Sequence, residues 1–237
     1  MIGIIAAMDK EIDGIKNMMM EECEVDKKVI SGMEFWQGTL YDNDVVLVRS
    51  GIGKVNAAMA AEVLSTVYNV KSLINTGIAG SLDDRIDIGD IVLSTEAQEH
   101  DMDVTGLGYK KGIIPDQDTS VYKADERLAG IAQEVCHKVN PDIKVFLGKV
   151  VSGDQFISDK AAKQAIIENV GGMCTEMEGA AIAHVAHMND VPFLIIRSIS
   201  DKANDDAEVD YPSFQKKAIN NSVKLVSGML SLMAQLD

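Results

Sequence analysis

Two glutamates, an aspartate and an arginine stand close together in the last third of the chain and have the residue types of a polar site. Glu176 and Glu178 precede an alanine-rich segment, and Asp201 follows the apolar run 193–199. Arg197 lies inside that run, so its charge needs a carboxylate partner. The stretch is typical of a strand, a helix and a second strand. Because ligands bind at the carboxyl ends of strands in an open parallel sheet, we expect the three carboxylates to meet there.

Each of these residues also has an interpretation that involves no chemistry. Glutamates before a helix suit the helix dipole, and a Ser-Asp pair after a strand often caps the next helix. An arginine in an apolar strand can pair with a carboxylate for purely structural reasons. The coincidence of all of them at consecutive strand ends favours a site.

Two further segments place polar or glycine residues at a predicted strand end. Glu11 lies in the first turn of a predicted helix, after the buried strand 2–7, and its alternative role is again a dipole-friendly surface glutamate. The segment 50–54 (Ser-Gly-Ile-Gly-Lys) puts two glycines at a strand–helix junction. It matches neither the dinucleotide-binding nor the P-loop motif, so these glycines either approach a ligand closely or permit a tight turn.

The acidic segment 96–105 raises the hypothesis of a metal site, because it combines four acids with His100. The acids alternate with other residues along an extended segment, so they would point in more than one direction. No second His-rich segment is evident, and His184 and His187, three apart on a predicted helix, are more often just a helix face. We therefore predict neither a metal site nor a cofactor.

Composition narrows the class of protein. The formal net charge is −15, from 37 acidic and 22 basic residues, which argues against nucleic acid or an anionic membrane as a partner. Three widely spaced cysteines without a C-x-x-C pair suit a reducing compartment. The apolar N-terminus lacks a basic leader, and no apolar run approaches the roughly 18–20 residues of a membrane span. These features predict a cytoplasmic protein.

Hydrophobic periodicity predicts an α/β protein in which strands and helices alternate through most of the length. We expect one domain over residues 1–237, with three α-β-α layers around a mixed, largely parallel twisted sheet. A loop at 106–121 is long enough to be a lid or to line a substrate site. The expected strands are 2–7, 25–30, 33–40, 44–49, 72–76, 88–94, 143–152 and 193–199, and the expected helices are 10–20, 54–68, 125–139, 160–169, 180–186 and 211–236.

At this level of detail the sequence resembles the bacterial 5′-methylthioadenosine/S-adenosylhomocysteine nucleosidases, of the purine nucleoside phosphorylase-like superfamily. The matching motifs run through nearly the whole chain and are together highly specific. They are G-I-I-A-A-M-D-K-E at 3–11, S-G-I-G-K-V-N-A-A at 50–58, N-T-G-I-A-G at 75–80, G-D-I-V at 89–92, H-D-M-D-V-T at 100–105, V-S-G-D-Q-F-I at 151–157, E-M-E-G-A-A-I-A-H-V at 176–185 and R-S-I-S-D at 197–201.

The resemblance implies hydrolysis of an N-glycosidic bond of a small nucleoside, with a role for each matching residue. Glu11 would activate the attacking water, Asp201 would protonate the purine, and Glu178 would bind the ribose hydroxyls. Phe156 would stack on adenine and Ser200 would support Asp201. The other residues implied to bind substrate are Ala7, Met8, Ile52, Val104, Leu107, Ile157, Glu176, Met177, Arg197 and Tyr211.

The resemblance also implies a homodimer in which the partner subunit contributes to the pocket for the alkylthio tail. Two positions depart from the family's pattern. Ile78 stands where a small hydroxyl residue is usual, which removes one polar contact to water or ribose, and Leu107 stands where an aromatic residue is common.

The superfamily contains phosphorylases as well as hydrolases, so the nucleophile has to be argued separately. Phosphate binding needs arginines, and the chain has four, at 49, 85, 127 and 197. The superfamily's phosphorylases carry a Gly-Asp-Pro-type loop and a further arginine where this chain has Ala7-Met8-Asp9 and Asn75. Glu11 would repel phosphate, which favours water. The alternatives are a related phosphorylase, a nucleosidase for a modified purine nucleoside, and a nucleoside-binding module without catalysis.

Overall fold

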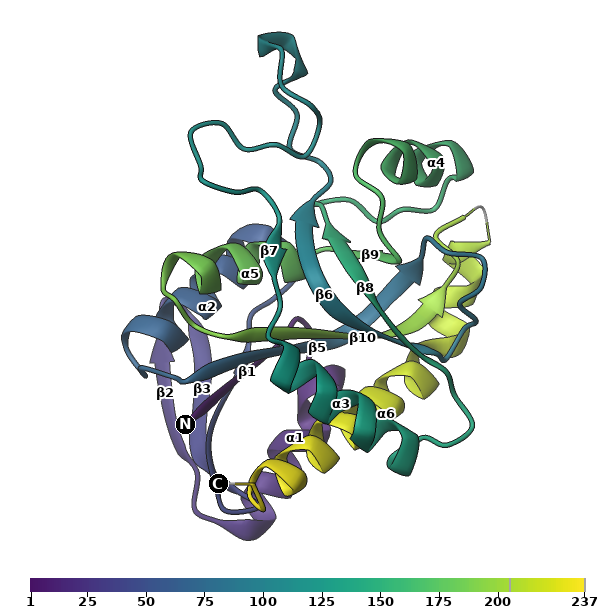
Figure 1. Ribbon diagram of the computed structural model, residues 1–237. Helices are drawn as coiled ribbons and strands as arrows, with labels where there is room; N and C mark the ends of the chain where they lie inside the picture. The colour runs from purple at the N-terminus through teal and green to yellow at the C-terminus, as the bar shows by residue number, and fades with distance from the viewer. Residues whose placement is uncertain (205, 237) are drawn as a thin grey trace.

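The computed structural model describes residues 1–204 and 206–236 and consists of a single mixed sheet with helices on both faces (Figure 1). From the sequence, the polar and acidic segment 203–210 is expected to be a loop, and one of its residues, Asp205, lies outside the described residues. The elements in chain order are β1 (Ile2–Ala6), α1 (Asp9–Glu22), β2 (Asp26–Ile30), β3 (Met33–Leu40), β4 (Asn43–Arg49), α2 (Lys54–Thr66), β5 (Ser72–Ser81), β6 (Ile91–Glu99), the 3₁₀ turn η1 (Thr105–Leu107), β7 (Tyr122–Lys123), α3 (Glu126–Val139), β8 (Val145–Ser152), α4 (Lys160–Asn169), β9 (Cys174–Glu176), α5 (Gly179–Met188), β10 (Phe193–Asp201) and α6 (Ala207–Met233).

The helices form the outer two of three layers, as the alternating pattern predicts. Helices α1, α3 and α6 pack together on one face of the sheet, and α2 and α5 cover the other (Figure 1). Because helices cover both faces of the sheet, β5 and β10 at its centre are buried along their whole length and carry mostly apolar side chains. Local signals agree with the boundaries, since the side chain of Asp125 caps α3 and that of Asp159 caps α4.

The strand pairing brings distant parts of the chain to one place. Parallel pairs join β1 to β4 and β5, β5 to β10, and β8 to β6 and β9. Antiparallel pairs join β10 to β6 and β5 to β9, so the circuit β5–β10–β6–β8–β9 returns to β5 and closes. The carboxyl ends of β1, β5, β8, β9 and β10 therefore surround one region of the molecule.

Two expectations from the sequence were wrong in detail. Strand β5 does not end before the segment 77–80 but continues through it to Ser81, because its two glycines let buried side chains of other elements approach. Helix α6 begins at Ala207, before Tyr211, and Pro212 lies inside it. The alanine-rich face of α2 packs against α5 of the same chain.

The loop between β6 and β7 projects away from the body of the molecule and carries η1 at its tip (Figure 1). No helix among the described residues is both long and apolar enough to cross a bilayer.

Candidate active site

A cavity of about 600 Å³ opens at the carboxyl ends of the central strands. It is lined by residues from β5, β9 and β10 and from the segments that follow β1, β4 and β8, together with the start of α6. This is the edge of the sheet at which α/β proteins bind ligands. The lining residues are Ala7, Met8, Glu11, Ile52, Ile78, Ala79, Gly80, Gln155, Phe156, Ile157, Thr175, Glu176, Met177, Glu178, Ser200, Asp201, Glu208, Tyr211 and Pro212.

Glu11 reaches the cavity from the first turn of α1. Its Oε2 accepts the backbone N–H groups of Ala7 (3.1 Å) and Met8 (2.9 Å), which orients the carboxylate and satisfies amides at the start of the helix. Met8 is the capping residue, so the helix begins at Asp9, one residue before the predicted start at residue 10. Burial raises the pKa of Glu11, although the nearby Arg197 and these amides act in the opposite direction. A carboxylate with a raised pKa is a stronger base near neutral pH.

Arg197 lies beneath the cavity floor and holds the carboxylates in place. It is 1% exposed, and its guanidinium donates to Glu176 and, at 2.6 Å, to Oδ1 of Asn75. Its Nη2 lies 3.6 Å from Oε2 of Glu178. Burial lowers the pKa of Arg197, but the surrounding glutamates outweigh burial and raise it, so the group stays charged. The site therefore rests on a buried cation.

Glu176 faces the cavity but is fully engaged in the protein. Besides Arg197, its carboxylate accepts the Ser152 hydroxyl and the backbone N–H groups of Glu178 (3.1 Å) and Gly179 (2.8 Å). Its lone pairs are thus occupied before any ligand arrives. Its position fits the support of Glu178 and Arg197, and the predicted contact with substrate stays a prediction.

Glu178 precedes α5 and is 6% exposed. Its Oε1 accepts the backbone N–H of Gly53 at 2.9 Å, which ties the glycine segment after β4 to this carboxylate. Burial and the neighbouring Glu176 raise the pKa of Glu178 to about 7, against the pull of Arg197 and the Gly53 amide. Near neutral pH the carboxyl group of Glu178 is therefore present in both its protonated and its ionised form.

Asp201 ends β10 on another wall of the cavity. The Ser200 hydroxyl donates to Oδ2 and the Ala203 N–H donates to Oδ1, each at 2.8 Å. Burial raises the pKa of Asp201 in spite of these two donors. A buried carboxyl group with a raised pKa can hold a proton for delivery to a leaving group.

The cavity mouth is apolar and aromatic. Phe156 and Tyr211 meet edge to face with ring centroids 5.6 Å apart. Tyr211 donates to the sulfur of Met8 at 3.6 Å, and Ile78 packs in the same cluster. Ile78 lines the cavity with a hydrocarbon side chain, as its departure from the family's pattern implies.

Three of the predicted substrate-binding residues do not line the cavity. Arg197 lies below it, buried among the carboxylates. Val104 and Leu107 lie in the projecting loop, and Leu107 is 76% exposed, because η1 extends away from the sheet within this chain. The other predicted residues all line the cavity.

Several residues that shape the site were not predicted from the sequence. Asn75 and Ser152 hold Arg197 and Glu176 from below, and ordinary strand residues of these types carry no local signal of such a role. At Gly77, an added Cβ would lie 2.1 Å from a guanidinium nitrogen of Arg197 and 2.9 Å from a Glu11 oxygen. The signal for Gly77 was present, since an isolated glycine in a strand often marks a close approach.

Comparison with known proteins places this geometry in a family. Residues 1–231 match the model of the phosphorylase superfamily. The 5′-methylthioadenosine/S-adenosylhomocysteine nucleosidase of Shewanella pealeana is 40% identical over 97% of this chain and 98% of its own length, and that of Halalkalibacterium halodurans is 41% identical over 95% of each.

Solved structures agree with the sequence comparison. The Neisseria meningitidis 5′-methylthioadenosine/S-adenosylhomocysteine nucleosidase, in complex with methylthio-immucillin-A, superposes with a TM-score of 0.91 at 34% identity over 98% of each chain. The futalosine hydrolase of Helicobacter pylori also has a TM-score of 0.91, at 28% identity over 98% of this chain and 97% of that one.

The raised pKa of Glu178 predicts a pH-dependent difference in stability between the protein and its Glu178→Gln variant. Between about pH 4.5 and pH 7 the unfolded chain has released the Glu178 proton while the folded chain retains it, so this group's contribution to the free energy of unfolding falls as pH rises. Glutamine does not titrate. We expect the variant to gain up to about 3 kcal/mol relative to the wild type over this range, as measured by urea unfolding at several pH values.

The control is Glu134→Gln, which removes an exposed carboxylate on α3. Its stability difference from the wild type should stay nearly constant with pH. A Glu178→Gln difference that is equally constant would contradict a raised pKa at this position.

Proposed function

The chain belongs to the 5′-methylthioadenosine/S-adenosylhomocysteine nucleosidases of the phosphorylase superfamily, and on that premise we propose that it hydrolyses the N-glycosidic bond of these two nucleosides. The products are adenine and either 5-methylthioribose or S-ribosylhomocysteine. The observation that carries the proposal is the arrangement of three buried carboxylates, Glu11, Glu178 and Asp201, around one cavity.

The carboxylates divide the reaction between two charges. As the glycosidic bond lengthens, the base gains negative charge and the ribose becomes cationic, as in other glycoside hydrolyses. Protonated Asp201 supplies a proton to the departing adenine, whose face rests on Phe156. Ionised Glu178 accepts the ribose hydroxyls and stabilises the positive sugar. Ionised Glu11 takes a proton from the water that attacks the anomeric carbon.

The electrostatics of the cavity support water as the nucleophile. None of the described residues that line the cavity is a lysine or an arginine. The nearby Arg197 is buried and already donates to Glu176 and Asn75, and it also approaches Glu178. A phosphate dianion would meet three carboxylates with no free cation to bind it. A hydrolase is therefore favoured over a phosphorylase.

We further propose a cytoplasmic homodimer in which the partner's projecting loop completes the mouth of the cavity. Ile52 and Phe156 are 55% and 49% exposed at this mouth, so part of the apolar wall is open in the single chain. Val104 and Leu107 are carried outward on the projecting loop, which is where residues that serve another subunit would lie. The family resemblance supports the same assembly.

Product analysis with 5′-methylthioadenosine is the first test of the hydrolase assignment. We expect adenine and free 5-methylthioribose at a rate that phosphate does not change, measured by chromatography with and without phosphate. A phosphate-dependent rate and a sugar 1-phosphate would identify a phosphorylase. Adenine release only from another nucleoside, such as futalosine, would redirect the substrate assignment while keeping the chemistry.

The variant Glu11→Gln should lose turnover by about 100-fold or more, because the amide cannot accept a proton from water. The glutamine oxygen can still accept the Ala7 and Met8 amides, so the helix start and nucleoside binding should survive. Single-turnover kinetics and calorimetric titration with a substrate analogue separate the two effects. Full activity in this variant would refute the water-activating role.

The variant Asp201→Asn should slow release of adenine by about 100-fold or more, because the proton donor is gone. The 4-nitrophenyl glycoside of 5-methylthioribose releases 4-nitrophenolate, a leaving group that needs no protonation. Its hydrolysis should be slowed much less by this substitution. Since Asp201 acts in its protonated form, wild-type activity should also fall as pH rises through its raised pKa, and the variant should lack that limb. Equal losses on both substrates would contradict the assignment.

A further inference from the structure

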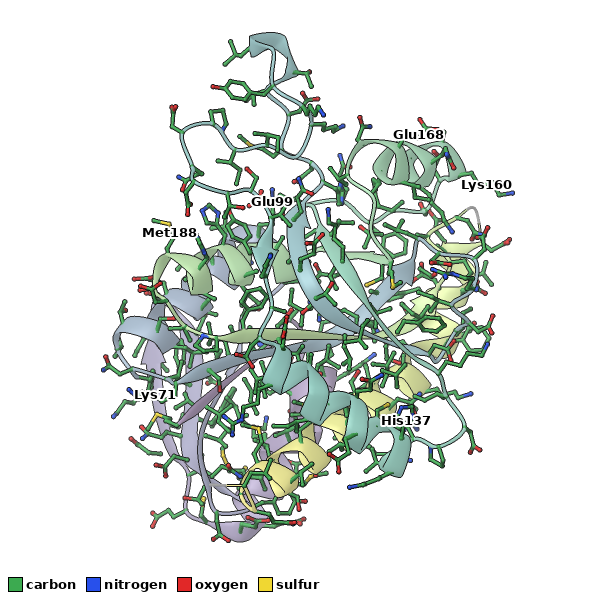
Figure 2. The ribbon with its side chains drawn as sticks, in the orientation of Figure 1. Lys71, Glu99, His137, Lys160, Glu168 and Met188 are labelled. Atoms are coloured by element: carbon green, nitrogen blue, oxygen red, sulfur yellow. The ribbon has the colours of Figure 1, made fainter. Side chains whose placement is uncertain are left out.

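The glycine segment 50–54 and the acidic segment 96–105 meet in one ion cluster beside the cavity. The proposed reaction assigns no role to this cluster. Lys54, at the start of α2, donates from Nζ to Oε2 of Glu99 and to Oδ1 of Asp101, each at 2.6 Å. Figure 2 shows Glu99 at the end of β6, where the projecting loop begins. All three side chains are less than 20% exposed. An ammonium group thus occupies the place between the acids where a metal ion was considered.

The cluster closes into a ring of hydrogen bonds, here called the Lys54 ring and made of Lys54, Asp101 and Asp154. The backbone N–H of Lys54 donates to Oδ1 of Asp154 at 2.8 Å. The backbone N–H of Asp154 donates in turn to Oδ2 of Asp101, also at 2.8 Å, and Asp101 accepts the Lys54 ammonium. The ring therefore fastens together the segments that follow β4, β6 and β8.

Two segments held by the Lys54 ring lead directly into the cavity. Gly53, which precedes Lys54, donates its N–H to Glu178. Asp154 is followed by the segment 155–157, whose three residues all line the cavity. The Lys54 ring thus joins the amide that orients Glu178 to the wall that carries Phe156.

The packing around the ring leaves little room for adjustment. A Cβ added at Gly53, which has a φ of 96°, would lie 3.1 Å from Oδ1 of Asp154. A Cβ added at Gly153 would lie 2.4 Å from the buried imidazole of His100. The two glycines therefore fit where the ring draws the loops together, and side chains at these positions would force the loops apart.

The charges of the ring persist at neutral pH. Burial lowers the pKa of Lys54, but its hydrogen bonds to Asp101 and Glu99 outweigh burial and raise it. Burial likewise raises the pKa of Asp101, but Lys54 and the Asp154 amide outweigh it and lower the pKa. Partly buried, charge-assisted hydrogen bonds of this kind are stronger and more directional than exposed surface pairs.

We propose that Lys54 is a positioning residue for the nucleosidase reaction, an inference that rests on the function proposed above. The ammonium keeps the Lys54 ring closed, and the closed ring holds the Gly53 amide on Glu178 and fixes the Phe156 wall relative to the ribose ligand. Lys54 acts through these two residues and touches no reacting atom.

The test compares Lys54→Met, Lys54→Arg and Lys138→Met in steady-state hydrolysis of 5′-methylthioadenosine. Methionine keeps the stem but not the charge, so we expect kcat/KM to fall about 10-fold to 100-fold, the scale of a small misplacement of reacting groups. Arginine can still bridge two carboxylates, so we expect it to recover most of this loss. Lys138→Met removes an exposed ion pair with Glu134 on α3 and should change neither kcat nor KM.

The pH profile provides a readout that a merely structural lysine would not move. The Gly53 amide favours the ionised form of Glu178, so loosening it raises the pKa of Glu178 further. The acid limb of kcat/KM should shift to higher pH in Lys54→Met and return in Lys54→Arg. The charged groups that face Glu178, namely Glu176, Arg197 and Glu11, are the same in every variant.

A second break in the ring guards against a variant that does not fold. Asp154→Ala removes the acceptor of the Lys54 amide but leaves the Lys54 ion pairs with Glu99 and Asp101, and it should show the same loss and the same shift of the acid limb. Thermal unfolding of each variant gives the folded fraction used to normalise the rates.

The inference is overturned if both ring variants lower only the unfolding temperature and leave kcat/KM and the acid limb unchanged. It is also overturned if arginine at position 54 is as damaging as methionine. These outcomes require an active wild type, so they differ from a failure of the proposed function, in which the wild type itself releases no adenine from 5′-methylthioadenosine.

Discussion

The buried guanidinium of Arg197 is the interaction on which the site depends. Carboxylates removed from water are costly, and four of them, Glu11, Glu176, Glu178 and Asp201, are buried around one cavity. Arg197 offsets this cost for the three glutamates, because it pairs with Glu176, approaches Glu178 and lowers the pKa of Glu11. The carboxylates that raise the pKa of Arg197 most are the three glutamates, and Asp201 is not one of them. Asp201 instead accepts hydrogen bonds from the Ser200 hydroxyl and the Ala203 N–H.

This unequal distribution of positive charge assigns different tasks to chemically similar side chains. The Glu176 carboxylate accepts hydrogen bonds from several groups of the protein, so its task is structural. Glu11 and Glu178 keep some contact with the cation and a face toward the cavity. Asp201 is supported mainly by two hydrogen-bond donors, with a smaller electrostatic contribution from Lys163, which suits a group that must spend time protonated. Environment, more than residue type, separates acid from base.

Much of the fold and of the site was predictable because it follows from local patterns. The apolar run of β10 with Arg197 inside it required a buried carboxylate partner, and Glu176 is that partner. The predictions failed where long-range contacts decide. The extension of β5 through Gly77 depends on Arg197, which is 120 residues later in the chain. The positions of Val104 and Leu107 depend on where the projecting loop points, and no periodicity in the sequence encodes that direction.

The absence of a side chain at Gly77 has a consequence for how the protein can vary. The space beside this residue is filled by the Arg197 guanidinium and the Glu11 carboxylate, so even one methyl group would push against both. The position does not line the cavity, and a survey limited to substrate contacts would pass over it. Substitutions that silence this chemistry can therefore arise in the middle of a strand, where a change from glycine to alanine would ordinarily be counted as harmless.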